Sequence, residues 1–460
     1  MTAQEIVERG LAASTTEGCV VLVHETSSVN LRWAVNTLTT NGFMAGRDVT
    51  VVAVVGEGQQ ASAGVVTRTG ATADTVADLV AAAQVAAVEN GIEEDANPLV
   101  EGVPASPDWD DPPAVTSAGV FETIAPGLGE AFGRARGEQR ELFGYAEHDL
   151  VTSYLGTSTG LRLRHAQPTA RFELTGKSDS RSLSTWVGAG GRDFGGTDVV
   201  AMDDEVRTRL DWQSRRVEVP PGRHTTLLSP SALADLMVYL YWTADARDAA
   251  EGRTVFSRPG GRTRVGETLT PRALRLFSDP AYPGLECEPF VSTTTSSSAA
   301  SVFDNGLPVA ATEWLHDGRL ANLYSSRHTA ALTGLPVKPP QDNLILEDRA
   351  AAGSLQDLVA TTDDGLLLTC LWYIREVDPQ NLLLTGLTRD GVYVVRGGEV
   401  VGATTNFRFN ESPVDMLGRI DEVGGTRPCL PREWADFFSR AAMPPVRIDG
   451  FNMSTVSEGT

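Results

Sequence analysis

The chain has 460 residues, of which 41% are hydrophobic and 21% are charged, the balance of an ordinary soluble protein. Asp and Glu number 60 against 38 Lys and Arg, so the formal net charge is −22. This charge disfavours binding to nucleic acid or to anionic membranes, because both need basic surface. The length predicts two domains or one large one, with an ample core.

The cysteine spacing and the N-terminal segment predict a cytoplasmic protein. None of the four cysteines lies in a CxxC spacing, which is typical of reduced cytosolic thiols rather than of a disulfide framework. The opening MTAQEIVERGLAAS predicts an amphipathic helix and lacks the basic and apolar regions of a signal peptide. No apolar run approaches the length of a membrane span.

The first part of the chain alternates between helical and extended patterns. Apolar residues at helical spacing predict helices, and β-branched or alternating runs predict strands. The helices are expected over 2–13, 73–89, 120–136 and 198–212, and the strands over 18–24, 28–39, 49–55, 63–69 and within 138–187. We expect an antiparallel sheet, since the strand connections are too short for crossovers.

Turn signals and loops divide this first part. Asn41-Gly42 is a hairpin turn signal, and Ser158-Thr159-Gly160 marks a turn between two alternating runs. Residues 96–113 are rich in proline and aspartate without periodicity, which predicts an exposed linker or loop. We place a domain boundary near Gly222, which gives an N-terminal α+β domain over 1–222 and a C-terminal β-rich domain over 223–460.

The second half predicts one strong helix followed mostly by strands. Ser229-Pro230 is a hydroxyl cap with a proline at the first helical position, and the helix is expected to reach about Arg247. β-structure is expected over 285–325, with turns at Asp304-Asn305-Gly306 and Asp317-Gly318. Short helices are expected over 325–335 and 354–360, a strand over 366–372 and a disordered tail over 453–460.

The stretch from Gly386 to Leu417 carries the most specific pattern. Two β-branched runs flank the Gly397-Gly398 turn, and the run NFRFNES (406–412) then leads into a helix capped by Ser412. This stretch resembles the C-terminal part of the TldD/TldE (PmbA) family of cytoplasmic, two-subunit metallopeptidases. The resemblance extends over most of the chain, is most specific over 366–417 and is weak over 97–113.

The resemblance implies a fold and a zinc site that can be sought in this sequence. In TldD-type subunits an HExxxH motif on a helix and a cysteine near the C-terminus hold zinc, with the glutamate as general base. The helix expected to carry the motif begins at Pro230 and contains no histidine. With Glu251-Gly252 matched to the acidic-glycine pair after the motif, the motif positions fall on Thr243, Ala244 and Asp248.

The remaining candidate ligands are isolated in the sequence. Cys429 stands where the family's cysteine ligand is expected, but a lone thiolate cannot hold catalytic zinc, so it is read as a buried or vestigial thiol. No two of the six histidines are spaced as ligands on one helical face. His24, beside Glu25 at a strand end, is a candidate base, although such a histidine more often lies on the surface or in the core.

Two glycine-containing stretches have alternative interpretations. Gly156-Thr157-Ser158-Thr159-Gly160 matches GxSxG, but the alternating LRLRH that follows indicates a hairpin turn, whereas a nucleophile elbow is followed by a helix. Gly188 to Gly196 (GAGGRDFGG) lacks the strand–glycine–helix order that holds a phosphate and is interpreted as a flexible loop.

The resemblance implies a TldE/PmbA-like subunit that binds no metal itself and works with a zinc-bearing TldD-type partner on unfolded peptides. The hairpin region would then form the peptide channel or the subunit contact, with Tyr393, Asn406, Arg408 and Asn410 as the candidate residues. The alternative is a self-sufficient, homodimeric amidohydrolase of the same family that acts on a small amide, for example in natural-product metabolism. A link to DNA gyrase has also been attached to the family, but the charge of −22 argues against direct contact with DNA.

Overall fold

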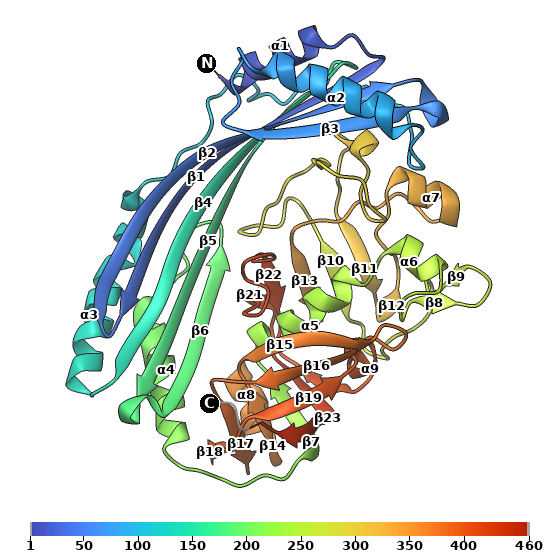
Figure 1. The fold of residues 1–460 in the computed structure, drawn as a ribbon. Coiled ribbons are helices and arrows are strands. Elements are labelled where there is room, and N and C mark those ends of the chain that lie inside the picture. The colour runs from blue at the N-terminus through green and yellow to red at the C-terminus, as the bar shows by residue number, and fades with distance from the viewer. Residues whose placement is uncertain (1, 458–460) are drawn as a thin grey trace.

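The computed structural model describes residues 2–457 and has two halves that face each other (Figure 1). The first half contains a six-stranded antiparallel sheet in the order β3-β2-β1-β4-β5-β6. Its strands are β1 (Gly18–Ala34), β2 (Thr37–Val55), β3 (Ser62–Thr69), β4 (Glu141–Thr157), β5 (Arg162–Ser178) and β6 (Leu183–Gly191). The mixed α+β class and the antiparallel sheet predicted for this half are confirmed.

The first two strands are far longer than the sequence patterns suggest. The strand expected over 18–24 and most of the one expected over 28–39 are one continuous strand, β1, which ends at Ala34. The turn that follows lies at Val35-Asn36, so residues 37–39 already belong to β2. Both turn residues have positive φ, 51° and 59°, as a tight hairpin turn requires. The turn expected at Asn41-Gly42 is therefore wrong: these residues pair with Leu31 and Asn30 within the sheet.

Helices cover one face of this sheet, and the second half of the chain covers part of the other. The helices are α1 (Ala3–Ala13), α2 (Val76–Asn90), α3 (Ala125–Gly137) and α4 (Val199–Gln213), with a 3-10 helix at Ala118–Thr123. Val21 and Val23 of β1 pack under α1 and α2, and Val29 and Trp33 pack under α3 and α4. Val20 and Leu22 alternate with Val21 and Val23 and therefore point to the other face, because side chains alternate along a strand.

That other face shares a core with the second half. Val20 and Leu22 pack in one cluster with Phe290, Val302 and Phe303. Segments that are far apart in the sequence therefore complete each other's apolar surface.

The second half contains a nine-stranded sheet and a six-stranded sheet around one core. A nine-stranded sheet runs in the order β15-β16-β19-β23-β7-β14-β17-β18, with β20 paired to β23, and a six-stranded sheet runs in the order β12-β11-β10-β13-β22-β21. The strands of the first are β7 (Gly222–Leu228), β14 (Asp364–Leu368), β15 (Leu371–Asp378), β16 (Leu383–Thr388), β17 (Val392–Arg396), β18 (Glu399–Ala403), β19 (Phe407–Glu411), β20 (Ile420–Val423) and β23 (Val446–Val456). Those of the second are β10 (Arg275–Ser278), β11 (Thr312–His316), β12 (Arg319–Leu320), β13 (Leu344–Glu347), β21 (Arg427–Cys429) and β22 (Ala441–Met443), and β8 (Ser257–Arg258) and β9 (Arg262–Thr263) form a separate hairpin.

One helix lies in the centre of this half. α5 (Pro230–Trp242) begins at the Ser229 cap, whose hydroxyl accepts a hydrogen bond from Ala232 N at 3.3 Å, and nearly all of its residues are buried. It ends at Thr243 and not near Arg247, because the chain turns there into the separate helix α6 (Ala246–Ala250). The shorter helices are α7 (Arg327–Thr333), α8 (Leu355–Ala360) and α9 (Pro413–Leu417).

Some extended segments differ from the prediction. Most of 285–311 is irregular, and Asp304-Asn305-Gly306 follows a 3-10 turn at Val302–Asp304. The hairpin turn at Asp317-Gly318 and the one at Gly397-Gly398 are confirmed. The tail predicted as disordered is a strand as far as Val456, and residues 458–460 lie outside the described part. Gly188 to Gly191, predicted as loop, belongs to β6.

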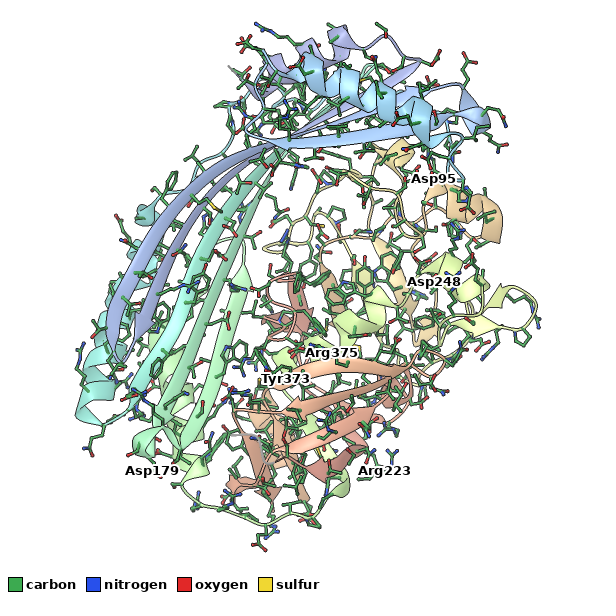
Figure 2. The ribbon with its side chains drawn as sticks, in the orientation of Figure 1. Asp95, Asp179, Arg223, Asp248, Tyr373 and Arg375 are labelled. Atoms are coloured by element: carbon green, nitrogen blue, oxygen red, sulfur yellow. The ribbon has the colours of Figure 1, made fainter. Side chains whose placement is uncertain are left out.

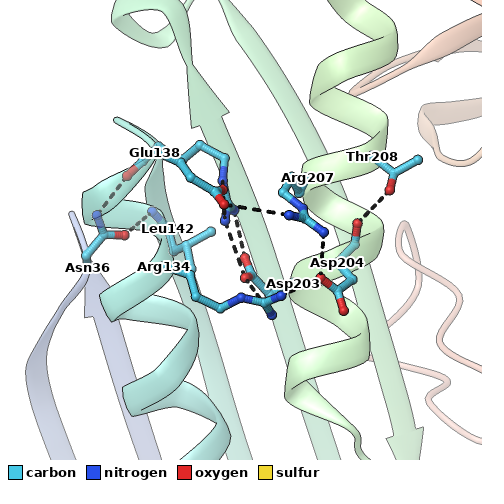
Figure 3. A network of polar contacts seen from close by, with 9 residues as sticks. Asn36, Arg134, Glu138, Leu142, Asp203, Asp204, Arg207 and Thr208 are labelled. Carbon is cyan, nitrogen blue, oxygen red and sulfur yellow. Dashed lines mark hydrogen bonds and ion pairs between the residues drawn. The ribbon is translucent and has the colours of Figure 1, made fainter.

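Buried ion pairs fix α3 and α4 to the sheet (Figure 3). Arg140 Nη1 lies 2.7 Å from Asp203 Oδ1, and the two side chains are 5% and 1% exposed. Arg134 reaches both Asp203 and the exposed Asp204. Asn36 joins the hairpin to this network, because its amide donates to Arg140 O and its Oδ1 accepts from Leu142 N.

Across residues 2–457, none of the helices combines the length and the apolar character needed to cross a membrane.

Candidate functional site

A polar cavity lies between the N-terminal sheet and the second half. It has a volume of about 550 Å³. We call it the chamber and define it by its lining residues: His24, Glu147, Asp149, Val151, Ser153, His165, Gln167, Thr169, Arg171, Glu288, Ser292, Asp342, Ala435, Asp436, Phe437, Phe438, Ser439 and Arg440.

One wall of the chamber is formed by polar side chains of the paired strands β4 and β5. On β4 and β5 the lining residues occur at every second position, so they share one face of the sheet. Ser153 lies directly opposite His165, and Glu147 directly opposite Arg171. The alternation that buries apolar residues under the helices therefore also presents a polar wall to the chamber.

Two imidazoles lie in this wall. His24 Nε2 is 3.3 Å from Ser292 Oγ, and His165 Nε2 is 3.0 Å from Gln167 Oε1. Burial lowers the pKa of both histidines, so both imidazoles are neutral at pH 7. A neutral imidazole can accept a proton from, or donate a hydrogen bond to, a ligand in the chamber.

A buried carboxyl group, that of Glu288, also lines the chamber. Burial raises the pKa of Glu288 to about 8, and the hydrogen bond from Ser153 only partly opposes this shift. Its Oε1 is buried and has no hydrogen-bond partner among the described residues. At pH 7 Glu288 is therefore mainly a neutral acid that can donate a hydrogen bond into the chamber.

An ion pair and hydrogen bonds connect the two halves around the chamber. Arg171 of β5 pairs with Asp436, and Arg440 Nη1 donates to Thr169 Oγ1 at 3.2 Å. Gln167 Nε2 donates to the carbonyl of Glu286 at 3.0 Å. With donors, acceptors and neutral acid–base groups on every side, the chamber suits a polar chain such as a peptide backbone better than an apolar ligand.

Aromatic side chains line the approach from the second half. Phe437 is 80% exposed beside the chamber, and Tyr373 on β15 is 53% exposed. Figure 2 shows Tyr373 and Arg375 on the side of β15 that faces the N-terminal sheet. The carboxylate of Glu433 accepts hydrogen bonds from the amides of Tyr373 and Ile374 at 3.1 and 3.0 Å, which fixes the start of this strand.

The residues matched to the zinc motif do not form a metal site. Thr243 ends α5, with its hydroxyl donating to Tyr239 O at 2.9 Å, and Ala244 is buried. Asp248 lies on α6 and accepts a hydrogen bond from Arg253 at 3.0 Å. Within residues 2–457, no group of three or more His, Cys, Asp or Glu side chains is arranged to hold a metal ion.

Aromatic packing takes up the end of α5. Trp242 packs edge-on against Trp434 with ring centroids 5.0 Å apart, and Tyr239 packs against the same Trp434 at 5.7 Å. Trp242 also contacts Phe438, a chamber residue, at 6.3 Å. Indole and phenol rings are not zinc ligands, so this donor set does not fit the zinc that the resemblance implies.

Cys429 lies beside α5 and is 5% exposed. Burial raises its pKa, and Asp235 of α5 lies nearby. Asp235 is fully buried: its Oδ1 accepts from Glu433 N at 3.0 Å, and its Oδ2 has no partner among the described residues. Burial also raises the pKa of Asp235 well above its usual range, so both groups carry their protons at neutral pH.

The four candidate channel residues are dispersed. Tyr393 is fully buried and packs edge-on against Trp212 at 5.0 Å. Asn406 lines a second cavity of about 810 Å³ between the β17–β19 region and the β5–β6 turn. Arg408 is exposed and donates to Thr385 Oγ1 at 3.3 Å, and Asn410 accepts from Asn452 Nδ2 at 3.2 Å through its carbonyl.

Sequence reasoning singled out one chamber residue, His24, and missed the others. Glu288, Asp342 and Arg440 come from irregular segments without a recognisable motif. The alternating polar residues of 165–171 were a usable signal, because a strand with polar groups at every second position has one hydrophilic face. The GxSxG stretch is the predicted turn between β4 and β5.

Sequence comparison matches residues 221–455 to the model of the PmbA/TldA metallopeptidase C-terminal domain. No curated protein matches the chain.

Solved structures match over nearly the whole length. TldE from Thermococcus kodakarensis has a TM-score of 0.78 at 16% identity, with 98% of this chain and 99% of that chain covered. A putative modulator of a DNA gyrase from Thermotoga maritima has a TM-score of 0.76 at 15% identity, with 98% and 100% covered. A putative modulator of DNA gyrase from Bacteroides thetaiotaomicron has a TM-score of 0.76 at 11% identity, with 98% and 97% covered.

Proposed function

Because this chain belongs to the PmbA/TldD metallopeptidase family, we propose that it is the subunit without zinc in a cytoplasmic TldD/TldE-type peptidase that degrades or processes unfolded peptides. A TldD-type partner carries the HExxxH motif and contributes both the zinc and the general base. The observation that carries this proposal is α5, which has no histidine and ends in packed aromatic rings. The structural likeness to a TldE protein supports the same subunit type.

The chamber supports a peptide as the substrate. Its walls offer hydroxyl, amide, imidazole and neutral carboxyl groups, which match the alternating donors and acceptors of an extended backbone. The exposed Phe437 and Tyr373 add apolar surface for side chains. In the complex, this subunit closes the compartment and holds the peptide, and the partner cleaves it.

The test is zinc content and peptidase activity of the purified chain, alone and mixed with the TldD-type partner. We expect no stoichiometric zinc and no activity from the chain alone, and activity from the mixture. A mixture with a partner whose motif glutamate is replaced by glutamine is the control and should be inactive. Zinc or activity from the purified chain alone contradicts the proposal.

We further propose that Asn406, Arg408 and Asn410 lie at the peptide channel or the subunit contact. All three belong to the segment around β19, and the Arg408 side chain is exposed. Arg408→Glu reverses a charge there and should weaken the complex or its activity, while Arg349→Glu at an exposed turn outside the hairpin region is the control. Unchanged affinity and unchanged activity of the Arg408 variant would remove this role.

The second candidate function is a self-sufficient, homodimeric amidohydrolase for a small amide. The observation that favours it is the His24–Ser292 contact of 3.3 Å beside the neutral acid Glu288. A hydroxyl next to a neutral imidazole is a potential nucleophile and base. Amide hydrolysis by the purified chain that Ser292→Ala abolishes would establish this function, and inactivity of the chain alone would exclude it.

A further inference from the structure

One half of β2 forms an uncovered edge of the N-terminal sheet. β3 pairs with β2 only from Asp48 to Val55, and Gly70 N donates to Arg47 O at 2.7 Å where this cover ends. From Thr37 to Gly46 the strand pairs with β1 alone, and all ten residues are exposed. We call these residues the open edge.

The open edge lacks most of the devices that protect natural sheet edges. Its sequence, TLTTNGFMAG, holds no charged residue and no proline, although the whole chain carries a net charge of −22. Charged side chains, prolines, bulges or covering segments normally prevent such an edge from pairing with another strand. A single irregularity, opposite Arg32 and Trp33, is the only such device along these ten residues.

Large apolar side chains flank the free backbone on both faces. Phe43 is 63% exposed and Leu38 is 53% exposed, and their partners across the pair, Val29 and Trp33, belong to the core under the helices. Met44 is 61% exposed and lies opposite Ser28, on the face that continues into the chamber wall. Free backbone groups flanked by exposed apolar side chains fit an incoming β-strand better than a small ligand.

We propose that the open edge pairs with the matching edge strand of the zinc-bearing partner subunit, so that one sheet runs through both subunits; this inference rests on the proposed function. Ten residues of strand span about 33 Å, enough for a continuous ladder between two long sheets. The added strands extend the wall that β4 and β5 form in the chamber.

The other side of the sheet is partly covered, and charge disfavours a second copy. β6 pairs with β5 from Ala170 to Ser178, and Ser106 hydrogen-bonds to Arg162 and Arg164 further along β5. β6 packs closely against the second half: a Cβ at Gly190 would lie 2.8 Å from Ser439 O. Two copies of this chain would each bring a charge of −22 to the contact, and long-range repulsion opposes their association. A partner of the same fold brings the matching edge without requiring identical charge.

The test measures the affinity of the full-length chain for the TldD-type partner by analytical ultracentrifugation. Phe43→Glu with Met44→Glu places two charges in the open edge, and the expected result is an increase in Kd of at least about tenfold, since charges buried without partners oppose association. Val85→Glu with Val88→Glu is the matched control, because these α2 side chains are 57% and 69% exposed and lie away from the edge. The control should leave the Kd unchanged.

Hydrogen exchange of the unmodified chain gives a second readout that does not depend on a variant. Amides of 37–46 should become protected when the partner binds. Binding without that protection, or equal affinity of the edge variant, overturns this inference and leaves the proposed function intact. Failure of the unmodified chain to bind the partner overturns the proposed function. Self-association that the edge variant abolishes overturns the partner named here in favour of a second copy.

Discussion

Asp203 and Asp204 are neighbours on α4, yet only the first is removed from water (Figure 3). Asp203→Ala leaves the guanidinium of Arg140 buried without its main partner, which costs about 3–5 kcal/mol. Asp204→Ala removes an ion pair whose carboxylate is 45% exposed, which costs about 0–1 kcal/mol. Urea denaturation of both variants checks this contrast, and equal losses of unfolding free energy would contradict the importance of the buried pair.

Glu288 gives the fold a pH dependence opposite to that of a salt-bridged carboxylate. Burial raises its pKa from 4.5 to about 8, so the folded chain keeps a proton that the unfolded chain releases in this window. Below pH 4.5 Glu288 is protonated in both states and does not destabilise the fold. Between pH 4.5 and about 8 the unfolded chain loses this proton more readily than the folded chain, so the free energy of unfolding falls as pH rises. Glu288→Gln should remove this decline.

Melting temperatures of the wild type and of Glu288→Gln, measured from pH 5 to pH 8, test this prediction. The difference between the two curves should grow in favour of the variant as pH rises. Glu101→Gln, at an exposed loop position, is the control and should follow the wild type. Parallel curves for Glu288→Gln and wild type would show that the carboxyl group ionises normally.

Among the elements, the close contact between α2 and β3 depends on a glycine, Gly64, which has no side chain. A Cβ on Gly64 would lie 2.1 Å from Ala83 O and 2.3 Å from Ala87 N, so Gly64→Ala must push the helix away from the strand. We expect a loss of about 1–3 kcal/mol. Gly46→Ala, where an added Cβ meets nothing within 4 Å, should change the unfolding free energy by no more than about 0.5 kcal/mol. Thermal unfolding of both variants compares the two sites.

Helix caps and tight turns were predicted correctly where the residues at those positions determine them. The hydroxyl caps at Ser229 and Ser412 and the turn at Gly397-Gly398 are placed as the sequence indicates. The Val35-Asn36 turn was missed because a β-branched residue with positive φ is locally unfavourable, and the long pairing of β1 with β2 imposes it. The same pairing overrides the turn tendency of Asn41-Gly42.

The irregular segment 285–311 was predicted as β-structure because of its apolar and turn residues. Its apolar residues instead pack against a distant part of the chain: Phe290 and Phe303 belong to the core on the inner face of the N-terminal sheet. The neighbouring sequence does not show whether an apolar residue packs in its own sheet or against a distant one.

At the scale of the whole molecule, this shared core should couple the two halves. Phe303 is fully buried among residues of both halves, so Phe303→Ala should cost about 3–5 kcal/mol. We expect one calorimetric transition in the wild type and one, at lower temperature, in the variant. Two separate transitions, with only one of them shifted, would show that the halves unfold independently.

The chamber could not be predicted as a site for a related reason. Its groups come from positions as far apart as His24, His165, Glu288 and Arg440, and only the folded arrangement brings them together. The absence of a zinc motif on α5 could be read directly, because that motif is confined to one helix. Local sequence patterns are therefore a poor guide to a site whose groups come from distant segments.

The core shared between the halves also has a consequence for synthesis on the ribosome. Val20, Leu22, Leu155, Leu161 and Leu163 leave the ribosome well before Phe290 and Phe303, which cover them in the finished protein. About 130 residues separate Leu163 from Phe290. At roughly 5–20 residues per second the nascent sheet displays this apolar face for about 6–26 seconds. During that interval it is a natural client for a chaperone that binds exposed aliphatic surface.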